Sequence, residues 1–138
     1  MNKLSKSIFL FVIVTEVLCI HIKGAEFFCG PANDILRFHI IANSDSEEDQ
    51  ELKMKVKSVV ASEVSADMQK EGIASGKQAK EYLRIHSQKY VKLARATIKE
   101  EGYNYKVTTT LGRHWFPIRV YGSTVYPEGE YEAYRMVI

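Results

Sequence analysis

The spacing of apolar residues changes abruptly near residue 45, and this change constrains the fold more than any other feature. From Ile35 to Ala42, apolar positions alternate with a second set, a period of two that is typical of a strand with one strongly apolar side. From Glu47 to about Met68 the period becomes helical, which predicts an amphipathic helix. The strand faces are Leu36, Phe38 and Ile40 against Arg37, His39 and Ile41, and the helical stripe is Leu52, Val56, Val59, Val60 and Val64.

A second helix is predicted from near Ser75 to Gly102. Ser75 and Gln78 have the spacing of a capping box, and Gly102 suits a helix C-terminus. The apolar stripe of this helix is Ala79, Leu83, Tyr90, Leu93, Ala94, Thr97 and Ile98.

The rest of the chain is predicted to consist of strands and turns. In order, these are a strand at 103–111, a turn at 112–117, a short strand at 118–121, a turn at 127–129 and a strand at 131–138. The resulting order β-α-α-β-β-β predicts an α+β domain, with two helices packed on one face of a mostly antiparallel sheet.

The N-terminal residues resemble a targeting segment. Lys3 and Lys6 precede the mostly apolar run 8–22, so residues 1–25 are predicted to be a signal peptide or N-terminal anchor. Residues 26–33 contain Gly30 and Pro31 and are predicted to be a linker, and residues 34–138 a single α+β domain. We therefore expect export, with membrane contact only through the N-terminal segment.

The charge balance argues against nucleic acid as a partner. The chain has 19 basic and 17 acidic side chains, and without Lys3, Lys6, Lys23 and Glu16 the remainder has 16 of each. Nucleic-acid binding normally requires a basic surplus or stripe. We expect no nucleic-acid binding.

The polar cluster Asn43–Asp49 admits two interpretations, a metal site or a helix start. Counted from Asn43, an EF-hand loop would need glycine at Glu48 and glutamate at Met54, so that pattern fails. Ser44 with Glu47, and Ser46 with Asp49, both have capping-box spacing, and acids suit the first turn of a helix. The cluster is predicted to be a doubly capped helix start without metal.

No catalytic constellation is predicted. Cys29 could act with His39, His86 or His114 only if one of them lay within hydrogen-bond reach, and Cys29 falls in the predicted linker. Serine-hydrolase, zinc-protease and phosphate-loop motifs are absent from the sequence. We expect neither catalytic residues nor a cofactor.

Arg113–Pro117 is the densest aromatic and basic stretch of the chain. The favoured interpretation is a hairpin connection with Trp115 and Phe116 folded onto the core. The alternative is an anchor for a partner protein, since Trp and Arg are favoured at binding hot spots.

Three segments, in order, resemble the stage II sporulation protein R family of endospore-forming bacteria. They are "LRFHIIANSDSEEDQELKMKVK" (36–57), "LGRHWFPIRVYG" (111–122) and "YPEGEYEAYRMVI" (126–138). Members of this family usually continue into a glycine-rich tail containing Trp and Cys, whereas this sequence ends at Ile138, so we expect either a fragment or a version without the tail. The resemblance implies that Cys29 could pair with a cysteine of such a tail.

The resemblance implies a developmental signal and not an enzyme. Such a protein is secreted from the forespore into the intermembrane space, where it activates a membrane-embedded aspartic protease that processes the precursor of the early mother-cell sigma factor. The alternative is an exported hydrolase acting on cell wall, with the acids of 45–49 in catalysis. The residues expected to bind the partner are Arg37, His39, Asn43, Asp45 and Asp49 at the strand-to-helix junction, and Trp115.

Overall fold

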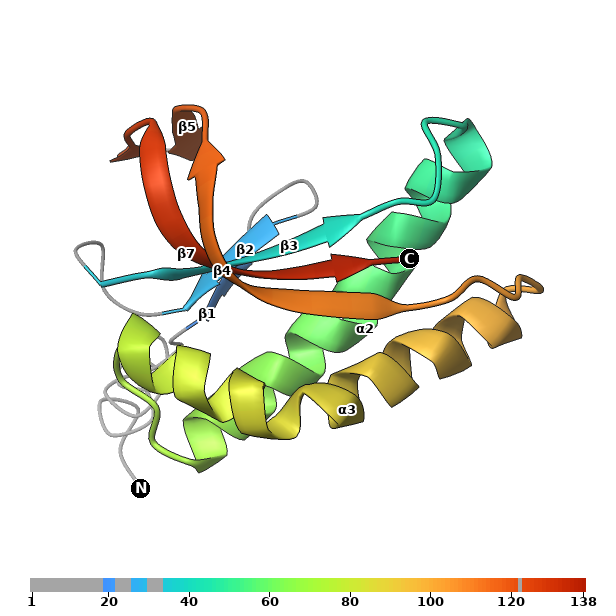
Figure 1. Cartoon of the computed structure of the whole chain (residues 1–138), viewed down its shortest axis with the longest axis horizontal. Helices are drawn as coiled ribbons and strands as arrows, with labels where there is room; N and C mark the ends of the chain where they lie inside the picture. Colours follow the sequence, from blue (N-terminus) through green and yellow to red (C-terminus); the bar gives the residue numbers. More distant parts are fainter. Residues whose placement is uncertain (1–18, 22–25, 30–33, 122) are drawn as a thin grey trace, which may run out of the picture.

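A computed structural model describes residues 19–21, 26–29, 34–121 and 123–138. Its elements are β1 (Cys19–His21), β2 (Glu26–Cys29), β3 (Leu36–Ile41), α2 (Glu47–Lys70), α3 (Gly76–Glu100), β4 (Thr108–Phe116), β5 (Arg119–Tyr121), β6 (Thr124–Tyr126) and β7 (Gly129–Val137). The α+β prediction is confirmed, because two long helices cover one face of a mostly antiparallel sheet (Figure 1).

The main sheet has five strands in the order β1-β2-β3-β7-β4. β7 lies between β3 and β4, pairing in parallel with the first and antiparallel with the second. The β4–β7 hairpin bends away from the helices toward β5 and β6, which form a separate two-stranded sheet (Figure 1).

The main core lies between the sheet and the helices. Leu36, Phe38 and Ile40 are completely buried there, as the alternation in the sequence predicts. Phe38 meets Tyr134 of β7 with ring centroids 4.7 Å apart. Val56 and Leu83 belong to the same core and come from α2 and α3.

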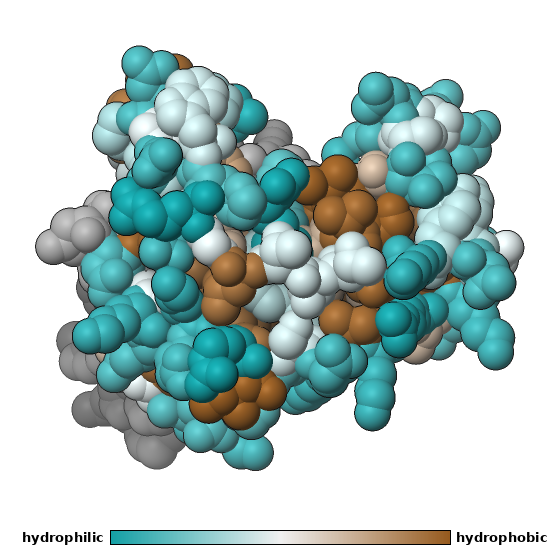
Figure 2. Space-filling model, viewed as in Figure 1, coloured by the Kyte–Doolittle hydropathy of each residue, from teal (hydrophilic) through white to brown (hydrophobic). Residues whose placement is uncertain are grey.

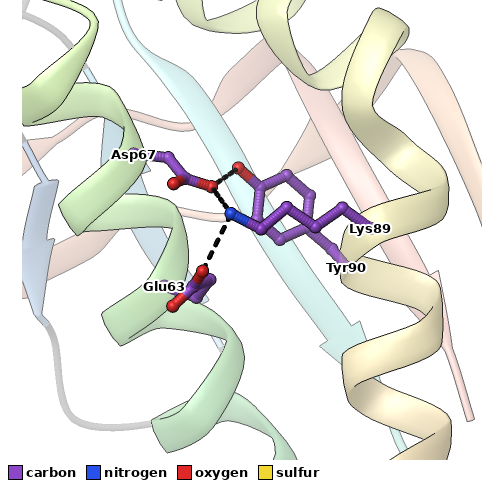
Figure 3. A network of polar contacts seen from close by, with 4 residues as sticks. All are labelled: Glu63, Asp67, Lys89 and Tyr90. Carbon is purple, nitrogen blue, oxygen red and sulfur yellow. Dashed lines mark hydrogen bonds and ion pairs between the residues drawn. The ribbon is translucent and has the colours of Figure 1, made fainter.

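A polar network joins the two helices (Figure 3). Lys89 Nζ of α3 lies 2.6 Å from Asp67 Oδ2 and 2.8 Å from Glu63 Oε1 of α2, and the Tyr90 hydroxyl donates to Asp67 Oδ2 at 2.7 Å. Burial opposes ionisation of Asp67, but the hydrogen bonds from Lys89 and Tyr90 outweigh it and lower the pKa of this carboxyl. The network therefore holds an ionised carboxylate between the helices.

The start of α3 touches the start of β3 backbone to backbone. Ser75 caps the helix by accepting a hydrogen bond from the Gln78 amide at 3.1 Å, as predicted. The next residue, Gly76, donates its amide to the Asp34 carbonyl at 2.8 Å. A Cβ on Gly76 would lie 2.5 Å from that carbonyl oxygen, so only glycine fits without displacement.

The structure differs from the sequence predictions in the C-terminal third. The predicted turn 112–117 is wrong, because β4 continues to Phe116 and pairs with β7 from Thr108 opposite Val137 to Phe116 opposite Gly129. Residues 103–107 precede the strand, and β6 was not predicted. Glu26–Cys29, within the predicted linker, forms β2 and pairs with β3.

Most of the predicted targeting segment 1–25 falls outside the described residues. Neither α2 nor α3 combines the length and apolar character needed to cross a membrane. Seen from the side of Figure 2, the surface is mostly hydrophilic, with hydrophobic patches in the notch between two projections. In Figure 1 these projections are the β5 end of the hairpin and the β3–α2 connection.

Candidate functional site

The six residues predicted to contact a partner lie in two separate places. Asn43, Asp45 and Asp49 lie at the connection between β3 and α2. Arg37 and His39 lie on the face of β3 opposite Phe38, away from the helices. Trp115 lies near the end of β4. The strand-to-helix junction therefore does not gather all five of the residues expected there.

The first place is a hydrogen-bonded cap, which we call the cap cluster (Asn43, Ser44, Ser46 and Asp49). Ser46 is the N-cap of α2, and its Oγ accepts a hydrogen bond from the Asp49 amide at 3.2 Å. Ser44 Oγ donates to Asp49 Oδ2 at 2.6 Å, and Asn43 Nδ2 lies 3.4 Å from the same oxygen. Capping by Ser46 is confirmed, whereas Ser44 bonds to Asp49 and the Ser46 amide and not to Glu47.

Asp49 is buried, with 4% of its surface exposed. The hydrogen bond from Ser44 lowers the pKa of this carboxyl, burial opposes the change, and hydrogen bonds from Tyr105, Asn43 and Ser46 add to the lowering. Asp49 is thus an ionised carboxylate that links the helix start to the segment after α3. A glycosidase needs a general acid with a raised pKa, so Asp49 does not suit that role.

Asp45 differs from Asp49 in its environment. Its side chain is exposed on the same connection, beside exposed Glu47 and Glu48. Of the predicted junction residues, it is the acid that a partner could reach directly. Within the ranges that the structure describes, no group of three or more histidines, cysteines or acids is placed to hold a metal ion.

The second place is centred on Arg37, a side chain with 0% of its surface exposed. Its guanidinium carbon lies 4.1 Å from the ring centroid of Phe116 and 4.7 Å from that of Tyr131. A guanidinium stacked on two aromatic faces is a favourable cation–π arrangement. Arg37 therefore supports the base of the β4–β7 hairpin, and its contact with a partner stays a prediction.

His39 lies beside this cluster and packs edge-on against Phe116, with ring centroids 5.9 Å apart. It opens onto a pocket of about 280 Å³, which we call the outer-face pocket. The pocket is lined by His39, His114, Trp115, Phe116, Pro117, Arg119 and Arg135. His39 of β3 and Trp115 of β4 therefore both border the outer-face pocket.

Trp115 and Phe116 have opposite environments. Phe116 is 4% exposed and Trp115 is 61% exposed. The favoured prediction, both rings folded onto the core, is right for Phe116 and wrong for Trp115. Adjacent residues of a strand point to opposite faces, so β4 extending to Phe116 separates the two rings.

Exposed apolar residues continue from Trp115 into the small sheet. Ile118, Val120 and Val125 are more than half exposed, and Val120 lies directly opposite Val125 in the β5–β6 pair. Tyr126 is buried in a small cluster with Ile35 and Tyr131. The small sheet therefore packs on one side and leaves apolar side chains exposed.

The histidines considered for cysteine catalysis do not form one site. His39 and His114 line the outer-face pocket, whereas His86 is exposed on α3 and stacks on Tyr82 with ring centroids 4.2 Å apart. Cys29 is paired across β2–β3 with Leu36.

Comparison with known proteins decides the family. The family model described as stage II sporulation protein R matches residues 32–138, most of the chain. The chain belongs to the stage II sporulation protein R family. A relative named Stage II sporulation protein R, from Bacillus subtilis (strain 168), is 35% identical over 98 residues.

That alignment covers 71% of this chain and 43% of the relative, so the matched region is less than half of the relative's length. No solved structure matches the chain. Membership of the stage II sporulation protein R family connects the protein with sporulation. The matched residues 32–138 include both the cap cluster and the outer-face pocket.

Sequence reasoning missed four residues that shape this stage II sporulation protein R domain. The Arg37 guanidinium lies over the rings of Phe116 and Tyr131, and Arg119 and Arg135 line the pocket. The sequence signal that could have found these residues is the alternation of side chains between the two faces of strands β4 and β7. Reading the strand through Gly112 would have placed His114 and Phe116 on one face with Arg135.

Proposed function

We propose that this protein is an exported sporulation signal that binds the extracytoplasmic side of a membrane-embedded aspartic protease and activates it. The protease then processes the precursor of the early mother-cell sigma factor. Secretion from the forespore into the intermembrane space would bring signal and protease together. The observation that supports this proposal most strongly is the family match over residues 32–138.

Features of the molecule agree with a binding role. The domain has its own buried core between sheet and helices, so it can present a defined surface. It exposes Trp115 and several β-branched residues at the hairpin end, and exposed large apolar groups often mark interaction surfaces. Asp49, the acid most firmly held near the junction, has a lowered pKa and is bonded within the cap cluster. That geometry weighs against the wall-hydrolase alternative.

The experiment is reconstitution in a bacterial host that does not sporulate. The full chain is co-expressed with the candidate membrane-embedded aspartic protease and its sigma-factor precursor, and cleavage of the precursor is followed by immunoblotting. We expect cleavage only when all three proteins are present. A protease lacking its catalytic aspartates should leave the precursor intact.

A chain without residues 1–25 tests the side of the membrane on which the signal acts. If residues 1–25 direct export, this variant stays in the cytoplasm and should not activate the protease. Equal cleavage with the variant would overturn extracytoplasmic binding. No gain in cleavage with the exported, folded chain would overturn the signalling role itself.

A further inference from the structure

The outer-face pocket concentrates positive charge on the sheet. Arg119 is exposed, while Arg135 and His114 are half-buried. None of the described residues that line the pocket is acidic. A concave site with guanidinium groups and without carboxylates favours an anionic ligand.

Four strands build this pocket. Arg135 comes from β7, directly opposite His39 of β3 on one side and Thr110 of β4 on the other. His114 comes from β4 and Arg119 from the start of β5. His39, His114 and Arg135 are held at a fixed separation by the paired strands β3, β7 and β4, and Arg119 joins them at the pocket from the separate β5–β6 sheet.

Neighbouring cations already have acidic partners, and the two pocket arginines do not. Arg113 lies 3.5 Å from Glu130, and Lys80 lies 2.9 Å from Glu132. Among the described residues, neither Arg119 nor Arg135 forms an ion pair. His39 lies across from Glu26 in β2, so we base the inference on the arginines alone.

The rim of the pocket adds an apolar surface. Trp115 lines the pocket and is largely exposed, and Ile118 follows Pro117 at its edge. Val120 and Val125 extend this surface onto the small sheet. Arginine beside an exposed tryptophan is the composition of a protein-binding hot spot.

We propose that the outer-face pocket binds an acidic peptide segment of a protein partner. Carboxylates of the segment pair with Arg119 and Arg135, and a neighbouring apolar side chain packs on Trp115 and Ile118. If the proposed function holds, the segment belongs to the extracytoplasmic part of the protease, and to this extent the inference rests on that function.

A peptide fits this surface better than an anionic membrane. The arginines lie in a recess, whereas a bilayer presents a broad surface. Glu128 and Glu130 are exposed where β7 begins, close to the same end of the hairpin. Exposed carboxylates near the pocket weaken its attraction for anionic headgroups.

The experiment uses Trp115 as a reporter, because it is the only tryptophan of the chain. The full chain in a non-ionic detergent is titrated with a synthetic peptide of alternating Glu and Leu, and tryptophan emission is recorded. The control peptide has Gln in place of each Glu. We expect the Glu peptide to shift the emission and the Gln peptide to bind at least about tenfold more weakly.

The matched variants remove equal charge from different faces. Arg119→Gln with Arg135→Gln should weaken binding of the Glu peptide at least about tenfold, since two charge-assisted contacts are lost. Lys77→Gln with Lys92→Gln removes two exposed charges from α3 and should leave binding unchanged. If the double variant is unstable, Arg119→Gln alone replaces it, because Arg119 is exposed and its substitution should not unfold the protein. This single variant should lose less affinity for the Glu peptide than the double variant.

Three outcomes would overturn the inference: equal binding of the Glu and Gln peptides, an equal loss in the α3 variant, or retained binding after both arginine substitutions. Flotation with neutral and anionic vesicles tests the membrane. The inference would also be overturned if more protein bound to anionic than to neutral vesicles and this difference disappeared with Arg119→Gln and Arg135→Gln.

Because the titration contains no protease, it is independent of the proposed function. If the peptide binds through the arginines but the precursor is not cleaved, the peptide-binding inference stands and the proposed function is wrong. If the peptide does not bind and Arg119→Gln with Arg135→Gln leaves cleavage unchanged, the proposed function stands and the peptide-binding inference is wrong.

Discussion

Arg37 lies on the sheet face away from the helices, yet its charged side chain is completely buried, whereas most arginines in proteins are exposed. Phe116 and Tyr131 cover its guanidinium from the β4–β7 hairpin. The charge thus ties β3 to a hairpin that comes much later in the chain. Phe116, one of these two rings, also lines the outer-face pocket.

Replacing Arg37 by Lys should lower the free energy of unfolding by about 2 kcal/mol. Lysine keeps the charge but lacks the planar group that stacks on the two rings. Urea unfolding followed by circular dichroism measures the change. Arg84→Lys on the exposed surface of α3 is the control and should change stability by less than about 0.5 kcal/mol. Equal stability of the Arg37 and Arg84 variants would contradict a structural role for Arg37.

Tyr90→Phe should cost about 1.5–3 kcal/mol, because it removes a hydrogen bond to an ionised carboxylate from a fully buried ring. Lys89→Gln acts on the same Asp67, but Lys89 is 45% exposed and should cost less than about 1 kcal/mol. Denaturant unfolding of both variants ranks the two contacts. A larger loss for Lys89→Gln would show that the ion pair and not the tyrosine holds the helices together.

At the level of single residues, the sequence predicted which face of a strand a residue occupies better than it predicted the side chains that pack around that residue. Alternation correctly placed Leu36, Phe38 and Ile40 on the buried face. It could not predict the burial of Arg37, because that depends on two rings brought in by nonlocal pairing. The cap was predictable because Ser46 and Asp49 are close in sequence and their bond is local.

At the level of elements, local sequence signals predicted the helices, which do not depend on pairing with distant strands. The helices begin and end close to the residues that the caps predicted. β4 was cut short in the prediction because Gly112 and Pro117 are turn-forming residues in isolation. In the sheet, Gly112 is an ordinary strand position opposite Ala133. The outer-face pocket was missed for the same reason.

Gly76→Ala should destabilise the protein by about 1–3 kcal/mol, although alanine is normally the better helix former. The added Cβ would lie 2.5–2.8 Å from the backbone of residues 34–36 and push α3 from β3. Gly112→Ala is the matched control, since nothing lies within 4 Å of its Cβ position. Thermal unfolding compares the two. Similar losses at both glycines would contradict the close approach of α3 and β3.

At the level of the whole molecule, two carboxylates make stability depend on pH. The pKa values of Asp49 and Asp67 are lowered in the folded protein from the ordinary 3.8. Their contribution is therefore complete above that value and is lost as the pH falls through the folded pKa. We expect the free energy of unfolding to decrease as the pH falls from about 4 to 3 and below.

Asp67→Asn should be less stable than the original chain at pH 7 and should lose less stability on acidification. Urea unfolding at pH 7, 5, 4 and 3 measures both curves. Asp45→Asn, at an exposed position of the β3–α2 connection, is the control and should keep the original pH profile. Parallel curves for Asp67→Asn and the original chain would show that other acids carry the pH dependence.

The position of β7 between β3 and β4 sets the order in which the main sheet can assemble. During synthesis, β3 and β4 leave the ribosome before the strand that joins them exists, because residues 129–137 follow both. Until then the helices have no complete sheet to cover. Long-range pairing of this kind forms slowly. The main sheet therefore cannot be completed until residues 129–137 have been made.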